Sequence, residues 1–370
     1  MKSYFSWKRP AAALFVLAGL TLASCNKDVP GPTAIPMPVP TGNTIGDIVN
    51  NDANFTYLRA ALTRVGMLPA VQDRNARFTV FAPDNTAFNR LFAALGLPQA
   101  EATIGALPLA QLAGILQYHV IPGQVVTSTM IPETFPNTFM PTLVQASSAS
   151  PLLKLMNFPS RRGASAFVDN IPVAQADITA ANGVIHRMAG VLLPPNTTTI
   201  WQALSADPNY SYLVAAITRA DLGMPASSKI VNLLNTASPY ANFTLFAPNN
   251  TAFDNLFRAL GVANPTISTV QLLSINSCIN ICAYHVMIRG VLNPTTSPAP
   301  DLIRVFSTNL PATATQTPTF LNMLAATAPR LTVSTAGIKG NSNATNAAIN
   351  RANWHNLNGV IHGVDQVLRP

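Results

Sequence analysis

The sequence predicts an α+β protein built from two similar domains, and three observations support this prediction. The segment Phe78–Phe88, FTVFAPDNTAF, returns at Phe243–Phe253 as FTLFAPNNTAF, with nine of eleven positions identical. Further matching segments precede and follow each copy in the same order. Within each unit, apolar residues first recur at helical spacing and later alternate in short runs, and helices followed by strands are typical of an α+β domain.

The matching segments indicate that a whole domain has been duplicated. Four pairs of segments match in the same order, with separations that increase slowly along the chain: 54–64 with 209–219, 78–88 with 243–253, 118–120 with 284–286, and 182–186 with 358–362. The second unit has about ten extra residues near Ser227 to Ser238. Units of this size bury a core of their own, so we predict domains at residues 43–195 and 196–370 rather than a short-period solenoid.

Helices are expected at the start of the first unit. Apolar residues at helical spacing occur in Thr44–Val49 and Phe55–Val65, and Gly66 is a typical helix stop. The repeated segment then predicts a short buried strand at Phe78–Phe81, which Pro83 ends because proline has no N–H for a sheet.

A further helix is predicted directly after this strand in both units. Asp84 and Asn85, like Asn249 and Asn250, are residue types that cap helix N-termini. Apolar residues follow at helical spacing: Phe88, Leu91, Phe92 and Leu95, matched by Phe253, Leu256, Phe257 and Leu260.

The rest of each unit is predicted to become richer in strands. Another helix, Leu109–Leu116, leads into Tyr118-His119-Val120. Short apolar runs then predict strands at Phe167–Val168, Ile171–Ala174 and Val184–Leu193, and Pro194-Pro195-Asn196 is the best domain boundary. In the second unit, the polar run Thr332–Asn353 is predicted to be a strand followed by an exposed loop.

Three of the repeated segments resemble the sequence boxes of the fasciclin (FAS1) adhesion domain family. These boxes are Phe-Thr-x-Phe-Ala-Pro with Ala-Phe, then Tyr-His, then Asn-Gly-x-Ile-His with Val-Leu-x-Pro. The resemblance implies two tandem FAS1-like domains, each with N-terminal helices packed on a β-rich wedge or sandwich. The motif residues that it implies to be structural are Phe81, Pro83, Phe88, Asn182, Gly183, His186, Phe246, Pro248, Phe253, Asn358, Gly359, His362 and Asp365.

Two positions depart from the family pattern. The family usually has Thr after the proline of the first box, whereas Asp84 and Asn249 stand there, and all three residue types cap helices. The last box is often followed by Asp, which is present as Asp365 but replaced by Ala189 in the first unit. We therefore expect any contact made by Asp365 to be missing from the first domain.

Residues 1–24 are predicted to be a secretory signal. Lys2, Lys8 and Arg9 give a positive start, and the apolar run Ala11–Ala23 has thirteen residues. A run of this length is too short to span a bilayer, which takes about 20 residues, but it fits a signal-peptide core. The segment ends in Leu-Ala-Ser-Cys25, which resembles the lipobox of bacterial lipoproteins and implies a lipid on Cys25. The alternative is an ordinary signal peptide followed by an incidental cysteine.

The segment 25–42 is predicted to be a tether between this anchor and the first domain. It contains five prolines after residue 29, which favour an extended spacer over a helix or a central strand. Its start, Asn26-Lys27-Asp28, resembles export signals on surface lipoproteins of the Bacteroidetes group. These features together predict an extracytoplasmic protein that is lipid-anchored to the outer membrane or the cell surface.

The charges of the chain argue against nucleic-acid binding. Only 10% of residues are charged, and the net charge of +8 includes three positive charges of the predicted signal. In the mature chain, Arg161-Arg162 is the only close basic pair, whereas nucleic-acid recognition needs a clustered basic stripe. A mildly basic surface is compatible with ordinary solubility and also with binding to anionic polysaccharide or headgroups.

The repeated histidines have two possible roles. Apolar neighbours favour hydrogen-bonded core residues for His119, His186, His285 and His362. In the resembled family the Tyr-His segment has been linked to adhesion, which implies Tyr118, His119, Tyr284 and His285 as candidate contact residues. The sequence does not separate a contact with a partner from support of the fold.

The remaining chemistry favours a binding protein over an enzyme. Cys278 and Cys282 lie four residues apart on one face of a predicted helix, where we expect two buried thiols. With His285 they are the closest approach to a metal site, but the first unit has Leu112 and Leu116 at the thiol positions, so we predict neither a metal nor a cofactor. The chain has only two Glu and no nucleophile, metalloprotease or phosphate-loop motif.

The sequence therefore predicts a cell-surface or envelope-anchored adhesion protein. Its expected partner is a protein or polysaccharide of the envelope, the matrix or a neighbouring cell, and two domains on one tether allow bivalent binding. The alternative is a structural envelope lipoprotein that packs against other envelope components without an exposed adhesive role.

Overall fold

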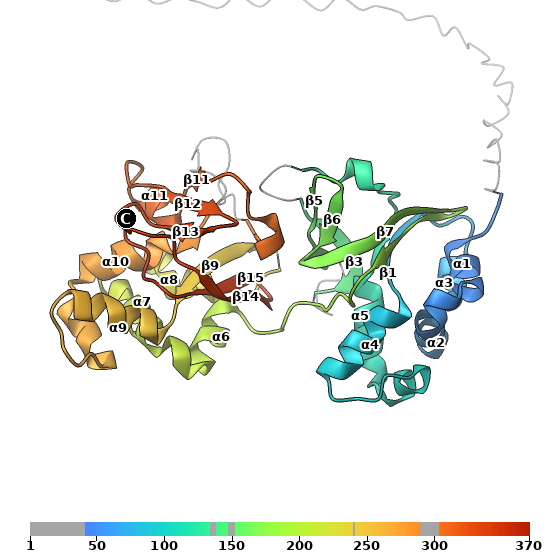
Figure 1. The fold of residues 1–370 in the computed structure, drawn as a ribbon, viewed down its shortest axis with the longest axis horizontal. Coiled ribbons are helices and arrows are strands. Elements are labelled where there is room, and N and C mark those ends of the chain that lie inside the picture. Colours follow the sequence, from blue (N-terminus) through green and yellow to red (C-terminus); the bar gives the residue numbers. More distant parts are fainter. Residues whose placement is uncertain (1–40, 134–137, 147–151, 240, 289–302) are drawn as a thin grey trace, which may run out of the picture. The chain divides into compact units, whose positions relative to one another are not determined.

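The computed structural model describes residues 41–370, except 134–137, 147–151, 240 and 289–302 (Figure 1). The predicted signal, Cys25 and nearly all of the tether lie outside the described residues. Within the described part of the chain, no helix has the length and apolar character needed to cross a membrane.

The first domain begins with helices and ends with strands, as the sequence predicts. Its helices are α1 (Ile45–Asn51), α2 (Thr56–Arg64), α3 (Leu68–Gln72), α4 (Asn85–Ala94) and α5 (Leu109–Tyr118). Its strands are β1 (Phe78–Pro83), β2 (Val120–Pro122), β3 (Met140–Gln145), β4 (Lys154–Asn157), β5 (Pro159–Arg162), β6 (Ser165–Val168), β7 (Ile171–Ala180) and β8 (Gly183–Met188).

The second domain repeats this order. Its helices are α6 (Ile200–Ala206), α7 (Ser211–Ala220), α8 (Ile230–Leu234), α9 (Asn250–Ala259), α10 (Ile275–Tyr284) and α11 (Phe320–Leu324). Its strands are β9 (Phe243–Pro248), β10 (Val286–Met287), β11 (Thr315–Thr317), β12 (Leu331–Ser334), β13 (Gly337–Lys339), β14 (Ile349–Asn356) and β15 (Gly359–Val364). Short 3-10 turns, including η3 (Ser128–Met130) and η8 (Ser307–Asn309), connect these elements.

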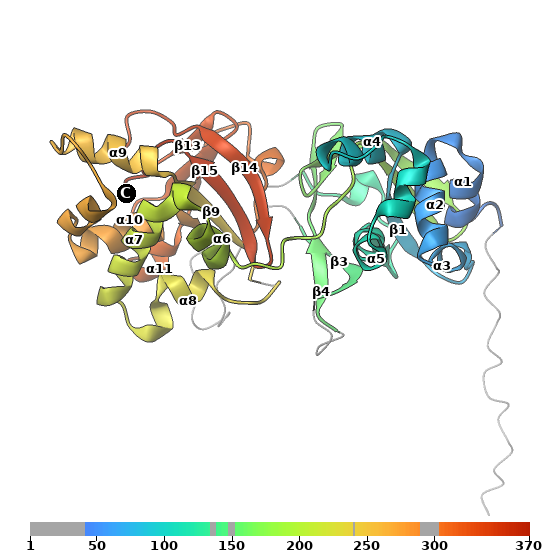
Figure 2. The ribbon, with the colours of Figure 1, turned by 90° about the horizontal axis from the view of Figure 1, so that it is seen from below.

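Each domain is centred on a sheet with one parallel pair. The order is β2-β1-β8-β7-β6-β5 in the first domain and β10-β9-β15-β14 in the second, with separate small sheets β3-β4 and β11-β12-β13. The parallel partners are β1 with β8 and β9 with β15, which place Phe81 opposite His186 and Phe246 opposite His362. Figures 1 and 2 show the helices of each domain lying together against one side of its central strands.

Helix capping follows the residue types that predicted it. The Asp84 carboxylate accepts a hydrogen bond from the Ala87 N–H at 2.8 Å, and the Asn249 amide oxygen accepts one from Ala252 at 2.9 Å. Phe88, Phe92, Phe253 and Phe257 are buried on the inner faces of α4 and α9. The expectation that Asp or Asn replaces Thr without loss of the cap is confirmed.

Several predicted boundaries differ from the structure, and β7, for example, continues to Ala180 rather than ending at Ala174. The helix before the first Tyr-His segment includes Tyr118, and β8 ends at Met188 rather than Leu193. The strand predicted at the start of Thr332–Asn353 is present as β12, but the predicted loop is shorter than expected, because it contains β13 and β14 begins at Ile349. Small polar residues give β14 little hydrophobic alternation, and its pairing with β15 supplies the order that its composition does not indicate.

Candidate functional site

The histidines of the two Tyr-His segments, His119 and His285, are buried. Each one hydrogen-bonds the helix that precedes it to the last residues of its own domain. His119 Nε2 accepts the Leu192 N–H at 2.9 Å, so its protonated Nδ1 donates to the Ile115 carbonyl at 2.7 Å. His285 makes the same pair of bonds with Leu368 and Ile281, at 2.9 and 2.8 Å. Burial disfavours the charged ring and lowers the pKa of both histidines to about 4, so both are neutral at physiological pH.

The two tyrosines of these segments are also buried. The Tyr284 hydroxyl donates to the Arg330 carbonyl at 2.8 Å and accepts the Asn341 N–H at 3.1 Å. The Tyr118 hydroxyl bonds to the Met156 carbonyl at 2.8 Å and to the Asp169 carboxyl at 3.0 Å. In this structure Tyr118, His119, Tyr284 and His285 support the fold, and none of them is more than 2% exposed.

Asp169 is a buried acid beneath Tyr118. Its Oδ1 accepts the Phe158 N–H at 2.9 Å, and burial raises the pKa of its carboxyl to about 7. Since the Tyr118 hydroxyl has one proton, a protonated Asp169 allows all of these contacts: the hydroxyl donates to Met156 and accepts from the carboxyl. The corresponding contact in the second domain uses a backbone N–H of Asn341 instead.

The histidines of the last box position a backbone bulge. His186 Nδ1 accepts the Asp177 N–H at 3.3 Å and Nε2 donates to the Val126 carbonyl at 2.8 Å. His362 makes the equivalent bonds with Asn353 and Val305 at the same distances. Burial lowers the pKa of His186 and lowers that of His362 to about 4. The interpretation of these repeated histidines as hydrogen-bonded core residues is confirmed.

The bulge itself is repeated and was not recognised from the sequence. Asp177 and Asn353, at equivalent positions of the two domains, both have φ of 60°, a left-handed conformation that Asp and Asn tolerate. Their side chains accept the N–H groups of Ser128 and Ser307, each at 2.8 Å, and also bond to those serine hydroxyls. Each bulge therefore fixes the start of a 3-10 turn, η3 or η8. The change from Asp to Asn hides this equivalence in the sequence.

The Asn-Gly pairs of the last box hold three chain segments together. The Asn182 oxygen accepts the Ile45 N–H at 2.8 Å, while its NH2 group donates to the carbonyls of Val71 and Asp73 at 2.9 and 3.0 Å. Asn358 similarly bonds to Ile200 and Leu234. A Cβ added to Gly183 would lie 2.0 Å from the Phe78 carbonyl oxygen, so the close crossing of β1 and β8 requires glycine.

The other motif residues are structural in position. His186 and His362 stack on Phe81 and Phe246, with ring centroids 5.5 and 5.7 Å apart. The motif residues that lie buried are Phe81, Pro83, Phe88, Asn182, Gly183, His186, Phe246, Pro248, Phe253, Asn358, Gly359 and His362, whereas Asp365 is exposed.

Asp365 makes a contact that the first domain does not need. Its carboxylate accepts the Ala348 N–H at 2.8 Å and thereby holds the chain at the start of β14. In the same alignment of the two domains, Ala348 corresponds to Pro172, which has no N–H to donate, and Asp365 corresponds to Ala189. The Ala189 N–H still donates to the Pro172 carbonyl at 2.9 Å.

The cysteine pair offers no reactive site. Cys278 and Cys282 lie buried on α10 with free thiols, and burial raises the pKa of both. Both ring nitrogens of nearby His285 are used in the bonds described above. In the described ranges, no group of three His, Cys, Asp or Glu side chains is placed to hold a metal ion.

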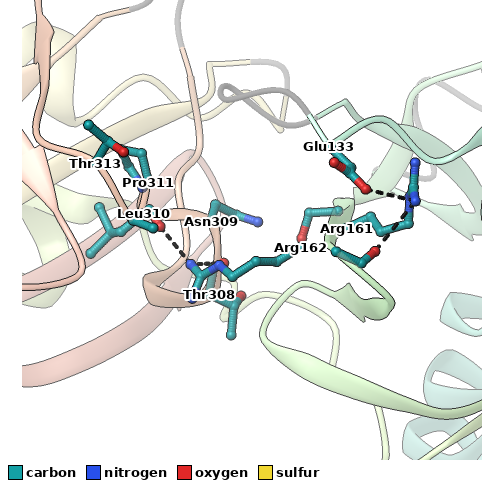
Figure 3. Close-up of a pocket in the computed structure, with 11 residues that line it drawn as sticks. Glu133, Arg161, Arg162, Thr308, Asn309, Leu310, Pro311 and Thr313 are labelled. Atoms are coloured by element: carbon teal, nitrogen blue, oxygen red, sulfur yellow. Dashed lines mark hydrogen bonds and ion pairs between the residues drawn. The ribbon is translucent and has the colours of Figure 1, made fainter.

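A pocket of about 320 Å³ lies where β5 and the turn that follows it meet the segment around η8 (Figure 3). Arg161 forms an ion pair with Glu133 at 2.8 Å, while Arg162 extends toward the other wall and donates to the carbonyls of Thr308 and Leu310 at 2.8 and 2.6 Å.

An aromatic contact next to this pocket joins the two domains. The rings of Phe158 and Phe306 lie 5.9 Å apart, and the buried guanidinium of Arg304 lies 5.0 Å from the centre of the Phe158 ring. Arg304 also donates to His355 Nε2 at 2.7 Å and to the Leu357 carbonyl at 2.9 Å. Burial lowers the pKa of Arg304 to about 10, and the charge of Asp169 opposes this shift.

Comparisons with known proteins agree with the duplicated architecture. The Fasciclin domain family model matches residues 53–194 and 208–370. Transforming growth factor-beta-induced protein ig-h3 of Sus scrofa is 31% identical over 159 residues, which are 43% of this chain and 20% of that protein. Stabilin-1 of Mus musculus is 32% identical over 166 residues, 45% of this chain and 6% of that protein.

A bacterial relative and one solved structure complete the comparison. Protein sll1483 of Synechocystis is 31% identical over 153 residues, 41% of this chain and 74% of that protein. A FAS1 domain pair from the insect cell adhesion molecule Fasciclin I aligns with 87% of this chain and 94% of its own, at 17% identity and a TM-score of 0.35. The chain matches only small fractions of ig-h3 and stabilin-1.

Proposed function

Because the chain belongs to the fasciclin domain family, we propose that it is an adhesion protein that binds a protein or polysaccharide partner outside the cytoplasm. The observation that supports this proposal is the presence of two complete FAS1 domains in one chain. Two domains on one tether raise avidity when both engage the same partner. The repeated polar groups described above are structural, so the proposal gives the protein no catalytic role.

The proposed location rests on the N-terminal sequence. Leu-Ala-Ser-Cys25 follows an apolar run of signal-peptide length, and a Pro-rich segment separates Cys25 from α1. A lipid on Cys25 and an extended tether together hold both domains away from the membrane surface. We propose anchoring in the outer membrane with the domains facing outward.

Protease treatment of intact cells tests location and function together. We expect protease to remove the wild-type protein from intact cells and to abolish their mutual aggregation, measured by sedimentation. The Cys25→Ala protein is expected to appear soluble in the periplasm or the medium, whereas the control Cys278→Ala stays attached. If intact cells fully protect the wild-type protein, the domains face inward and the structural envelope role replaces the adhesive one.

A further inference from the structure

A surface hollow of about 230 Å³ lies beside the bulge of the first domain. Its floor is formed by Val173, Ala174 and Ala176 of β7, which directly precede the bulge at Asp177. One wall is the start of η3 at Ser128, and the other is the turn between β5 and β6 at Gly163. We call this space the domain 1 hollow.

The second domain has a hollow of about 350 Å³ at the equivalent place. Its floor includes Ile349 and Ala352 of β14, which correspond to Val173 and Ala176 when the two domains are aligned on their last boxes. Its walls are Ser307 at the start of η8 and the turn between β12 and β13. We call this space the domain 2 hollow.

The same bonds shape both hollows. The buried histidine of the last box holds the bulge, and the bulge residue holds the serine at the head of the 3-10 turn. The floor and one wall are therefore fixed relative to each other in each domain. Duplication has preserved this geometry although Asp177 has become Asn353 and most wall residues differ.

The pocket of Figure 3, which we call the central hollow, shares lining residues with both of the other hollows. Arg161 and Gly163 line both the domain 1 hollow and the central hollow. Leu310 lines both the central hollow and the domain 2 hollow. The three spaces therefore adjoin in a row, with an equivalent floor strand at either end.

Both floor strands have an open edge at this row. The ladder between β6 and β7 pairs only Phe167 with Pro172 and Val168 with Ile171, and β7 continues to Ala180. In the second domain, an isolated bridge between Ile338 and Ala347 is the corresponding contact. Among the described residues β14 forms a ladder only with β15, and a single bridge from Asn196 reaches it at Asn356, the end of the strand away from Ile349. An open strand edge presents N–H and C=O groups in the pattern that another extended chain pairs with.

The side chains along the row favour a polypeptide over a sugar chain. Ala174, Ala176 and Ala352 of the floors have small side chains, which leave the backbone beside them accessible to a second backbone. None of the residues that line the three hollows is aromatic, so the row lacks the ring faces on which the apolar faces of sugars pack. Arg161 and Arg162 line the central hollow with a single carboxylate, Glu133, which gives this part a net positive charge.

From this geometry we infer that the row of hollows is the partner-binding groove, and that its ligand is an extended polypeptide segment with acidic side chains. The segment adds to the open edges of β7 and β14 and places an acidic side chain at Arg161 and Arg162. The inference rests on the proposed adhesive function, because it assigns that function a surface and a class of partner. One chain that crosses the row contacts both domains at once.

Phage-displayed linear peptides of twelve residues test this inference on the purified mature chain with Cys25→Ala. We expect selected peptides to be enriched in Asp and Glu. Their affinity, measured by fluorescence anisotropy, is expected to fall about tenfold or more in Ala176→Tyr, in Ala352→Tyr and in a double Arg161→Ser, Arg162→Ser variant, since each removes space or charge from the groove.

Matched controls separate the groove from other surfaces. Ala93→Tyr and Arg258→Ser change exposed residues on α4 and α9 and are expected to leave the affinity unchanged. Circular dichroism establishes that each variant is folded. The inference is wrong if no peptide is enriched, if the groove variants bind as the wild type does, or if a polygalacturonate oligomer binds the groove more tightly than the peptides.

Failure here is distinguishable from failure of the proposed function. The peptide assay uses purified protein and does not depend on where the chain lies in the cell. Surface exposure without peptide binding overturns the groove and leaves the adhesive proposal standing. Peptide binding by a protein that intact cells protect overturns the outward-facing location instead.

Discussion

Both ring nitrogens of four buried histidines are used in hydrogen bonds, and this arrangement works only when the rings are neutral. Each ring accepts a backbone N–H at one nitrogen, and protonation of that nitrogen removes the acceptor. In an unfolded chain the same rings have a pKa near 6.5, so the unfolded state binds more protons than the folded state between about pH 6.5 and 4.

We therefore predict that acid destabilises the second domain. Stability falls as pH decreases from about 6.5 to 4, because the folded-state pKa of His285 and His362 is about 4. At pH 5 the loss is roughly 2 kcal/mol for each histidine. Urea unfolding followed by tryptophan fluorescence measures it, since Trp201 and Trp354 are the tryptophans of the predicted mature chain and both belong to this domain.

In the first domain, Asp169 changes stability with pH in the opposite direction to the histidines, so the second domain is the better one in which to measure the effect of acid. Asp169 has a pKa raised to about 7, so its folded form holds a proton between about pH 4 and 7 and its contribution to stability is lost as pH rises. Stability of the second domain that stays constant or rises toward pH 4 contradicts the role assigned to the histidines.

At this scale the sequence identified the residues better than their contacts. Histidines in apolar contexts predicted buried hydrogen-bonded rings, but their partners are backbone groups that no pattern identifies. The sequence shows that Asp365 is replaced by Ala189 in the first domain, but it does not show why. In the structure Asp365 accepts the N–H of Ala348, and the residue equivalent to Ala348 in the first domain is Pro172. Because Pro172 has no N–H, the first domain has no donor that an Asp at position 189 would accept.

Among the elements, the parallel crossing of β1 and β8 imposes the strictest steric demand. Gly183 has a φ of 154° and lies against the Phe78 carbonyl, and any Cβ there would overlap this oxygen. Gly114, in contrast, lies within α5 with nothing near the position of an added Cβ.

We predict opposite effects for alanine at these two glycines. Gly183→Ala forces the strands apart and is expected to cost about 3 kcal/mol or more. Gly114→Ala is expected to stabilise the chain by about 0.5–1 kcal/mol, because alanine is the better helix former and reduces the entropy of the unfolded state. Differential scanning calorimetry of the mature chain compares the two; equal melting temperatures would refute the steric argument.

The elements predicted best are those with strong hydrophobic periodicity or cap residues, such as α1, α2, β1 and α4. Strand pairing was not predicted, because β1 and β8 lie far apart in the chain and nothing in either strand specifies its partner. The bulges and β14 escaped prediction because small polar residues give them no clear period.

At the scale of the whole molecule, the two domains share an aromatic and charged contact that the repeat does not contain. Arg304 occupies the position equivalent to Val125 in the first domain, as the matching bonds of Thr79 and Thr244 to the adjacent residues show. The duplication therefore predicted two domains. It did not predict the contact between them, because that contact depends on residues such as Arg304 that are not repeated in the other domain.

We predict that this contact couples the stability of the two domains. Phe158→Ala, although it lies in the first domain, is expected to lower the stability of the second by about 1 kcal/mol or more, because Phe306 and Arg304 lose a ring partner. Tryptophan fluorescence during urea unfolding measures the shift. The control Leu95→Ala changes a half-exposed apolar side chain at the end of α4 and is expected to leave this transition in place.

An unchanged tryptophan transition in Phe158→Ala would mean that the domains unfold independently. A groove that crosses both domains needs their contact to persist, so the coupling experiment also bears on the groove. The coupling of the two domains and the groove both require that the segment from Arg304 to Leu310 stays packed against β5.

The bonded Asn-Gly pairs have a consequence for the chemical lifetime of the protein. Asn-Gly is the dipeptide most prone to deamidation, in which the side-chain amide turns onto the next backbone nitrogen and closes a succinimide ring. In the folded chain the Asn182 amide is bonded at both its oxygen and its nitrogen, and Asn358 is held similarly, so neither turns. Isoaspartate at these two sites would therefore record how long each molecule has spent unfolded, so that the protein ages at the rate at which it opens.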